Sequence, residues 1–320
     1  MPEIRKPKIR KPEIKKPEVL HGYEHHHLHA SRWNDFEVRD NDIVISTSYK
    51  AGTTFMQTMV GHIIFHEEGL PAPINDLSPW LDMRVFPEEI LKETLHQQEH
   101  QRFIKTHLPL DGLVFHDNVK YIVVGRDPRD VFASLLNHWG NHTDSFFDLM
   151  NNTPGRPGEP FPKMGDDVHE LWSDWINKGW FDWESDGYPY WSHLHHCKTW
   201  WEYRHLPNIE FFHYTDMLEN LEREMRRVAN FIGVDVKEST WPVIINASSF
   251  ETVKKNPEKI VGDMDFSFKG GANTFINKGT NGRWKDILSD EDIKMYHQAM
   301  TRKLSPDCAN WLENGGPVKS

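Results

Sequence analysis

Two adjacent threonines, a glycine and an early lysine stand in the segment SYKAGTTFMQTMV, residues 48–60. Hydroxyl groups and backbone amides next to a glycine are donors that suit a phosphate or a similar anion. The segment departs from the Walker pattern G-x-x-x-x-G-K-[ST], because Lys50 precedes Gly52 instead of following it. A Walker loop also works with magnesium beside an aspartate, and we find no convincing apolar strand that ends in one. We therefore expect a metal-free anion site with Lys50 beside the reacting group. A helix start with a surface lysine explains the segment alone equally well.

Two later segments carry further cations near glycines. In IVVGRDPRDVFASLLNH, residues 122–138, an apolar run delivers Arg126 to its end, and Ser134 follows two helical turns later. A guanidinium group holds a phosphate through two parallel hydrogen bonds, whereas for Arg129 we favour a surface pairing with nearby carboxylates. In INKGTNGRWKDIL, residues 276–288, Lys278 and two glycines suit a close approach of the backbone to an anion. Its composition alone is more typical of a flexible surface loop.

Strands and helices are needed to position these segments. Short apolar runs predict four buried strands, at residues 42–47, 102–107, 120–126 and 209–214. Helical spacing predicts helices after three of them, at residues 54–65, 128–137 and 217–231. Asp127 and Pro128 are typical of a helix start, and Gly233 of a helix end. Strands that alternate with helices indicate an α/β fold, a single domain with a mainly parallel central sheet flanked by helices.

The composition argues against several classes of protein. The 320 residues carry a formal net charge of −11, which disfavours nucleic acid as the main partner. Cys197 and Cys308 are the only cysteines, so no disulfide framework is expected. No apolar stretch approaches the ~20 residues of a membrane-spanning helix, and the first residues lack the apolar core of a signal peptide. We therefore expect a cytoplasmic protein with no membrane partner.

The N-terminal residues differ from the rest. Residues 1–19 repeat a Lys-Pro-x-Ile unit with proline at every fifth position, which forbids a regular helix. We expect a disordered Lys/Pro-rich tail at residues 1–20, a domain at residues 21–320, and ordered structure from near Ser31; docking of the tail on an acidic partner is the alternative. Histidines at positions 25, 26, 27 and 29 lack a second set of spaced metal ligands, so we expect a solvated segment there.

In this order, the segments resemble the cytosolic-type sulfotransferases, which use 3′-phosphoadenosine 5′-phosphosulfate (PAPS). The 5′-phosphosulfate loop of that family is similar to STSYKAGTTF (46–55), its 3′-phosphate motif to GRDPRDVFAS (125–134), and its late glycine-rich segment to NKGTNGRWK (277–285). KTHLP (105–109) and SSFETVKKNP (248–257) also resemble family motifs. The resemblance extends from near residue 31 to residue 288 and implies the family's fold, a modified P-loop topology that binds PAPS.

The resemblance implies a role for individual residues. His107 is the implied general base, because imidazole titrates near neutrality, and Lys50 and Lys105 are implied to stabilise charge at the transferred group. The residues implied to bind PAPS, or its product PAP, are Lys50, Ala51, Gly52, Thr53, Thr54, Phe55, Arg126, Ser134, Tyr214, Ser248, Phe250, Lys278 and Gly279. Trp80 and His138 are implied to line the acceptor pocket. Residues 139–200 are rich in tryptophan and are expected to cover one end of the sheet, where these rings form either a lid or core.

The implied activity is transfer of the sulfuryl group of PAPS to a hydroxyl of a small aromatic or apolar acceptor, by in-line attack and without a metal. Two positions depart from the family pattern. Phe55 stands where a tryptophan usually stacks on adenine, and Asn277 stands where an arginine usually helps to hold the 3′-phosphate, so binding is expected to weaken unless Lys278 or Arg283 compensates. An ATP-dependent small-molecule kinase is the alternative, and a non-catalytic nucleotide-binding protein ranks below it. The acceptor and the oligomeric state stay open.

Overall fold

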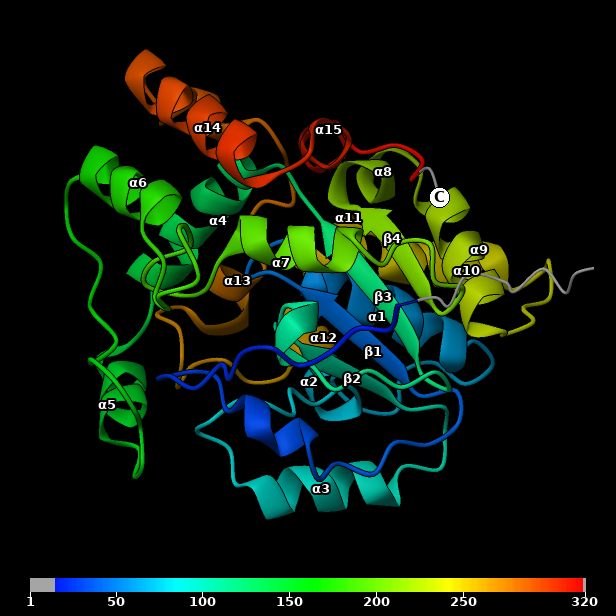
Figure 1. Ribbon diagram of the computed structural model, residues 1–320. Coiled ribbons are helices and arrows are strands. Elements are labelled where there is room, and N and C mark those ends of the chain that lie inside the picture. Colours follow the sequence, from blue (N-terminus) through cyan, green and yellow to red (C-terminus); the bar gives the residue numbers. More distant parts are fainter. Residues whose placement is uncertain (1–14, 319–320) are drawn as a thin grey trace, which may run out of the picture.

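The computed structural model describes residues 15–318, within which four strands form one parallel sheet in the order β2-β1-β3-β4 (Figure 1). Each strand lies inside an apolar run predicted from the sequence. Their bounds are β1 (Ile43–Thr47), β2 (Phe103–Thr106), β3 (Lys120–Gly125) and β4 (Ile209–His213). The prediction of a single α/β domain around a mainly parallel sheet is confirmed.

Both faces of the sheet are covered, which explains why its strands read as continuous apolar runs. Successive strand residues point to opposite faces: Ile43 and Ile45 pack with α1 (Thr53–Ile64) and α9 (Leu221–Ile232), whereas Val44 packs into the core on the other side. That second core includes the side chains of α7 (His193–Trp201), which crosses in front of the sheet in Figure 1.

The other helices surround this framework. Their bounds are α2 (Ile74–Leu77), α3 (Glu88–Gln97), α4 (Pro128–Gly140), α5 (Asp144–Asn152), α6 (Val168–Asn177), α8 (Tyr214–Glu219), α10 (Trp241–Ser248), α11 (Phe250–Lys255), α12 (Pro257–Val261), α13 (Gly271–Phe275), α14 (Asp290–Lys303) and α15 (Pro306–Asn314). Three short 3₁₀ turns are also present in the described part of the chain: η1 (Ala30–Trp33), η2 (Leu110–Gly112) and η3 (Arg283–Asp286). No helix within residues 15–318 has the length and hydropathy to cross a membrane.

The start of α4 confirms the predicted helix cap at Asp127 and corrects the surface pairing predicted for Arg129. The Asp127 carboxylate accepts a hydrogen bond from the backbone N–H of Arg129, as predicted for a helix N-cap. Arg129 does pair with carboxylates, those of Asp127 and Glu313, but it is buried instead of lying on the surface. The prediction of a surface pair was wrong because the rings of Trp284 and Tyr296 cover the guanidinium group.

The helix predicted at residues 217–231 is in fact two helices, α8 and α9. Asn220 breaks the regular spacing: its backbone is non-helical and its side chain accepts a hydrogen bond from Arg223 N at 3.0 Å. An asparagine side chain competes with the helical hydrogen-bond ladder and favours such a cap. Gly233 ends α9 in the left-handed conformation, as predicted.

The histidine-rich segment before Ser31 is ordered and buried, so the expectation of a solvated segment was wrong. His25, His26 and His27 are completely buried. The His25 ring stacks on Phe181, and His26 Nε2 lies 3.0 Å from the carbonyl oxygen of Pro189. Phe181 and Pro189, which supply part of this cover, lie far along the chain, where no local pattern reveals them. Within residues 15–318 no cluster of three or more histidine, cysteine or acidic side chains is placed to hold a metal. Residues 1–14 of the predicted tail lie outside the described residues.

Gly125, at the end of β3, is predicted to be essential for close packing against α15. A Cβ atom at this position would lie 2.4 Å from the Trp311 ring, so Gly125→Ala forces the core apart. We expect the free energy of unfolding to fall by about 1–3 kcal/mol, the usual cost of overpacking. Urea denaturation followed by fluorescence measures this loss. Gly22→Ala is the matched control, since no atom lies within 4 Å of its added Cβ; equal stabilities of the two variants would contradict the prediction.

Candidate active site

A cleft opens where the four parallel strands end. Lys50 follows β1, His107 follows β2, Arg126 follows β3 and Tyr214 follows β4, and all four side chains line the cleft. Because parallel strands point the same way, their carboxyl ends meet at one edge, the usual position of a ligand site in an open α/β sheet. The cleft encloses about 1060 Å³, including the part open to solvent.

The loop between β1 and α1 presents backbone N–H groups to this cleft. Lys50 and Gly52 have left-handed backbones, with φ of 64° and 120°. A Cβ atom at Gly52 would lie 2.8 Å from the Tyr214 ring, so the close approach requires glycine. The helix α1 then begins at Thr53, and no side chain caps its first N–H groups. Unpaired N–H groups at a helix start favour an anion.

The helix α7 holds this loop and the end of β3 in register. His193 lies between them: one ring nitrogen, Nδ1, pairs with the hydroxyl of Ser48, and Nε2 donates to the carbonyl oxygen of Arg126 at 2.9 Å. His196, one turn further, lies 2.8 Å from the hydroxyl of Ser46. Neither histidine was singled out from the sequence, because their partners lie between 67 and 150 residues earlier in the chain.

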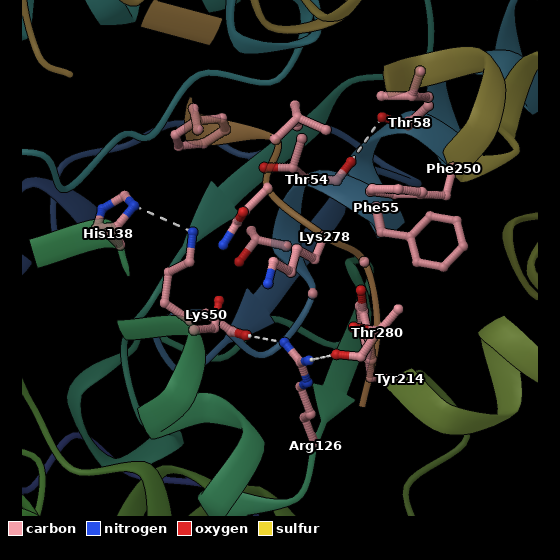
Figure 2. Close-up of a pocket in the computed structure, with 18 of the residues that line it drawn as sticks. Lys50, Thr54, Phe55, Thr58, Arg126, His138, Tyr214, Phe250, Lys278 and Thr280 are labelled. Atoms are coloured by element: carbon pink, nitrogen blue, oxygen red, sulfur yellow. Dashed lines mark hydrogen bonds between the residues drawn. The ribbon is translucent and has the colours of Figure 1, made fainter. Parts of the chain in front are cut away.

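Arg126 joins three parts of the cleft. Its guanidinium group donates to Lys50 O at 3.2 Å, to Thr280 O at 3.0 Å and to Asn281 Oδ1 at 3.1 Å, as Figure 2 shows for the first two. It also lies 4.0 Å from the ring centroid of Tyr214. No ion pair joins Arg126 to a carboxylate in the described part of the chain. Its charge is therefore available to a bound anion.

Positive charge dominates the cleft although the whole chain is acidic. Among the described residues that line it there is no aspartate or glutamate. The cations that line it are Lys50, Lys105, Arg126, Lys278 and Arg283. Like charges without counter-charges repel one another, and a ligand with several negative charges relieves that repulsion. The arrangement is therefore that of a polyanion site.

The two lysines nearest the sheet have lowered pKa values. Burial, with repulsion from Lys105 and Arg126, lowers the pKa of Lys50 to about 7. Burial lowers the pKa of Lys105 to about 8, although Asp82 opposes the shift. Lys50 Nζ lies 3.2 Å from His138 Nδ1, visible in Figure 2, and Lys105 Nζ lies 4.4 Å from the ring centroid of Trp80.

His107 presents a free ring nitrogen. Its Nδ1 lies 2.8 Å from the carbonyl oxygen of Thr47, and a carbonyl only accepts, so Nδ1 carries the proton. Nε2 is therefore unprotonated, and this buried atom has no hydrogen-bond partner among residues 15–318. Burial, and next the charge of Lys105, hold the pKa of His107 well below its ordinary value. The imidazole is thus a neutral base with its lone pair unoccupied.

Aromatic side chains form the other end of the cleft. Figure 2 places Phe55 and Phe250 together on the side away from His138. A Cβ atom at Gly279 would lie 2.4 Å from the Phe250 ring, so this glycine lets the late loop pack closely on the ring. Ser248 is buried, and its hydroxyl lies 2.9 Å from His62 Nδ1. Planar rings and hydroxyls at this end suit a nucleobase.

The structure brings together nearly all of the side chains predicted from the sequence. Two of them do not line the cleft: Ala51 is buried beneath the loop, and Trp80 lies behind, with its ring edge-on to His107 at 4.6 Å. Of the two readings of the tryptophan-rich segment, lid or core, Trp172, Trp175 and Trp191 fit the core, since they are buried. The cleft also contains residues that were not predicted, namely Tyr49, Thr58, Leu218, Val253, Phe275, Ile276 and Thr280. The four-residue spacing of Thr54 and Thr58 on one helix is a signal that predicts their common face.

Replacing Lys50 tests how much its buried charge lowers the stability of the ligand-free protein. Below pH 7 both folded and unfolded chains carry the charge, so the folded chain bears the full cost of burial. From pH 7 upward the unfolded chain binds more protons than the folded one, and the contribution of Lys50 to the free energy of unfolding rises. We expect Lys50→Met to raise the Tm of the ligand-free protein near pH 6, and this gain to shrink as the pH approaches about 10.

Thermal denaturation across this pH range measures the effect. Lys255→Met replaces an exposed lysine outside the cleft and is the control. A Lys50→Met protein that is less stable than the parent near pH 6, or whose gain does not change with pH, would contradict the burial argument.

The sequence is similar to known sulfotransferases over most of its length. The model of the sulfotransferase domain family matches residues 40–306. A glycolipid sulfotransferase of Mycobacterium tuberculosis is 30% identical over 297 residues, which cover 89% of this chain and 91% of the relative. Sulfotransferase 1B1 of Canis lupus familiaris is 27% identical, with 90% and 92% covered.

Solved structures share the fold. Mouse sulfotransferase SULT7A1 complexed with PAP matches with a TM-score of 0.64 at 18% identity, over 88% of this chain and 92% of that chain. Retinol dehydratase in a complex with retinol and PAP matches with a TM-score of 0.64 at 23% identity, over 86% and 84%. The family match and the relatives agree: the chain belongs to the sulfotransferase family of transferase enzymes.

Proposed function

We propose that the protein transfers the sulfuryl group of PAPS to a hydroxyl of a small acceptor with an aromatic or apolar body, and that His107 is the general base. The observation that carries the proposal is the unoccupied, unprotonated Nε2 of His107 beside a polycationic cleft that contains no carboxylate among its described residues. Solved relatives that contain PAP support the donor.

Each part of PAPS matches a group of side chains along the cleft, from the phosphosulfate at one end to the adenine at the other. Lys50, Gly52, Thr53 and Thr54 bind the 5′-phosphosulfate at the start of α1. The side chains that bind the 3′-phosphate are Arg126 and Ser134, with Lys278 and Gly279 of the late loop. The side chains that surround the adenine are Phe55, Tyr214, Ser248 and Phe250. Arg283 also lines the cleft, and it supplies the cation that is missing at Asn277.

The reaction is an in-line displacement at sulfur. The acceptor O–H bond breaks as His107 Nε2 takes the proton, and the acceptor oxygen forms a bond to sulfur. The bond between sulfur and the bridging oxygen of the 5′-phosphate breaks at the same time, and PAP leaves. Lys50 stabilises the negative charge that develops on the bridging oxygen, and Lys105 the charge on the sulfuryl oxygens. Protonated lysines are required for this role, and a bound polyanion raises their lowered pKa values.

The kinase alternative is less favoured. An ATP site needs oxygen ligands for magnesium beside the phosphates, and no aspartate or glutamate lines the cleft in the part of the chain that the structure describes. The early position of Lys50 also differs from that of a Walker lysine. We further propose that the protein acts in the cytoplasm, as the resemblance to cytosolic-type members implies.

Binding of PAP tests the donor. We expect PAP to raise the Tm of the protein without added magnesium, because ligand that binds only the folded chain stabilises it by mass action. At about 100 times the Kd, the gain in free energy of unfolding is about 2.7 kcal/mol. Differential scanning fluorimetry with PAP, and with ATP plus magnesium in parallel, measures the shift. Stabilisation by ATP with magnesium but not by PAP would establish the kinase instead.

Removal of the base tests the mechanism. We expect His107→Ala to lower kcat by about 10² to 10⁴ while PAP affinity changes less than about twofold, because a general base acts in the transition state. Initial rates with one accepted phenol or alcohol and calorimetric titration with PAP measure the two effects. His297→Ala, an exposed histidine on α14, is the control. A His107→Ala enzyme that keeps more than about a tenth of the parental rate would place the base elsewhere.

A further inference from the structure

A group of buried and half-buried rings adjoins His107. We call it the ring cluster; its members are His27, Tyr49, Trp80, Tyr190 and Trp191. The rings of Trp80, Tyr49 and Trp191 have centroids 4.6, 5.2 and 5.2 Å from that of His107. The same three rings lie 6.5, 6.3 and 6.0 Å from His27. His27 and the base therefore face one cluster, although His27 precedes β1 and His107 follows β2.

The hydrogen bonds of the histidine segment determine which nitrogen of His27 carries its proton. His26 Nε2 lies 3.0 Å from the carbonyl oxygen of Pro189, so it is the protonated nitrogen and His26 Nδ1 is bare. His27 Nδ1 pairs with His26 Nδ1 and must donate to it. Nε2 of His27 is then an unprotonated acceptor, and it has no partner within residues 15–318.

Unpartnered donors lie in the same cluster. Trp191 Nε1 is buried without a hydrogen-bond partner among the described residues, as is the hydroxyl of Tyr190. An indole N–H only donates, and buried tryptophans normally find a partner. The ring cluster that packs against His107 therefore contains one unpaired hydrogen-bond acceptor and two unpaired donors. Burial keeps the pKa of His27 well below its ordinary value, so the ring stays neutral.

We propose that His27 determines acceptor specificity: the acceptor has a second hydroxyl, which donates to His27 Nε2 and accepts from the indole N–H of Trp191. The acceptor class is a diol or polyol with an aromatic or apolar body, of which one hydroxyl is sulfated and another is held. A hydroxyl is the small neutral group that both donates and accepts; an ether or a carbonyl leaves His27 unpaired. This inference rests on the proposed function, because it places the acceptor next to His107.

The experiment compares acceptors that differ by one hydroxyl. The pairs are phenol with resorcinol, 4-phenylphenol with 4,4′-dihydroxybiphenyl, and cyclohexanol with cyclohexane-1,4-diol. Calorimetry measures the affinity of each for the PAP-loaded protein, and initial rates measure kcat/KM with PAPS. In at least one pair we expect the diol to bind about tenfold more tightly than its partner, because a site built for a hydroxyl discriminates against the analogue without it.

Variants then assign the preference to His27. His27→Phe keeps a ring but removes the acceptor nitrogen, and it should lower the diol preference to about twofold or less while mono-hydroxyl binding and PAP affinity stay unchanged. His27→Gln retains an acceptor oxygen and should restore part of the preference. His21→Phe is the matched control, since its ring stacks on Trp183 at 4.4 Å, outside the ring cluster.

Each outcome decides the inference. Equal affinity of the parent protein for both members of every pair overturns it, even if no His27 variant folds. An unchanged diol preference in His27→Phe overturns it as well. If the diol preference is present and depends on His27 but no sulfuryl transfer occurs, the proposed function fails while the diol site stands. If transfer occurs without any diol preference, the proposed function stands and this inference fails.

Discussion

The burial of cations without carboxylates is the constraint on which the rest of the site depends. Burial lowers the pKa values of both Lys50 and Lys105, and the charges of Lys105 and Arg126 lower that of Lys50 further. The histidines next to them stay neutral, since burial lowers the pKa of His107 and of His138. A carboxylate in the cleft would relieve the strain but would also compete with an anionic donor. The free energy of unfolding of the ligand-free protein is thus lower than it would be with a counter-charge in the cleft, and a bound polyanion raises it.

The positions of the anion-binding groups depend on neutral hydrogen bonds from α7. His193 bridges Ser48 and the backbone of Arg126, so the two loops cannot move independently without breaking a buried hydrogen bond. The start of α7 is in turn held by Asp186, whose carboxylate accepts from the backbone N–H groups of His193 and Leu194 at 2.9 Å each. The neutral ring of His193 thus positions charged side chains without adding a charge beside them.

Local patterns predicted the strands, the cap at Asp127, and Lys50 and Arg126 as cations beside an anion, whereas the resemblance to the sulfotransferases implied most of the other predicted side chains of the cleft. They failed where a distant segment changes the surroundings of a residue. A solvated segment was predicted at residues 25–27 because rings that bury these histidines, such as that of Phe181, come from far along the chain. Arg129 was predicted to lie on the surface for the same reason, because the rings that cover it, Trp284 and Tyr296, also come from far along the chain. Asn220 was missed because an amphipathic pattern continues across the cap that divides α8 from α9.

The sequence by itself determined the order of the strands and helices along the chain and the glycines that let the backbone approach its neighbours closely. It also determined the residues that can donate hydrogen bonds to an anion. These properties depend on residue type and spacing over a few positions, where hydrogen bonding and backbone sterics act. Only the tertiary structure decided which nitrogen of His107 is free, how far the pKa of Lys50 falls, and that His27 shares a ring cluster with the base. Those properties depend on partners and burial contributed by segments far apart in the chain, and no local pattern contains them.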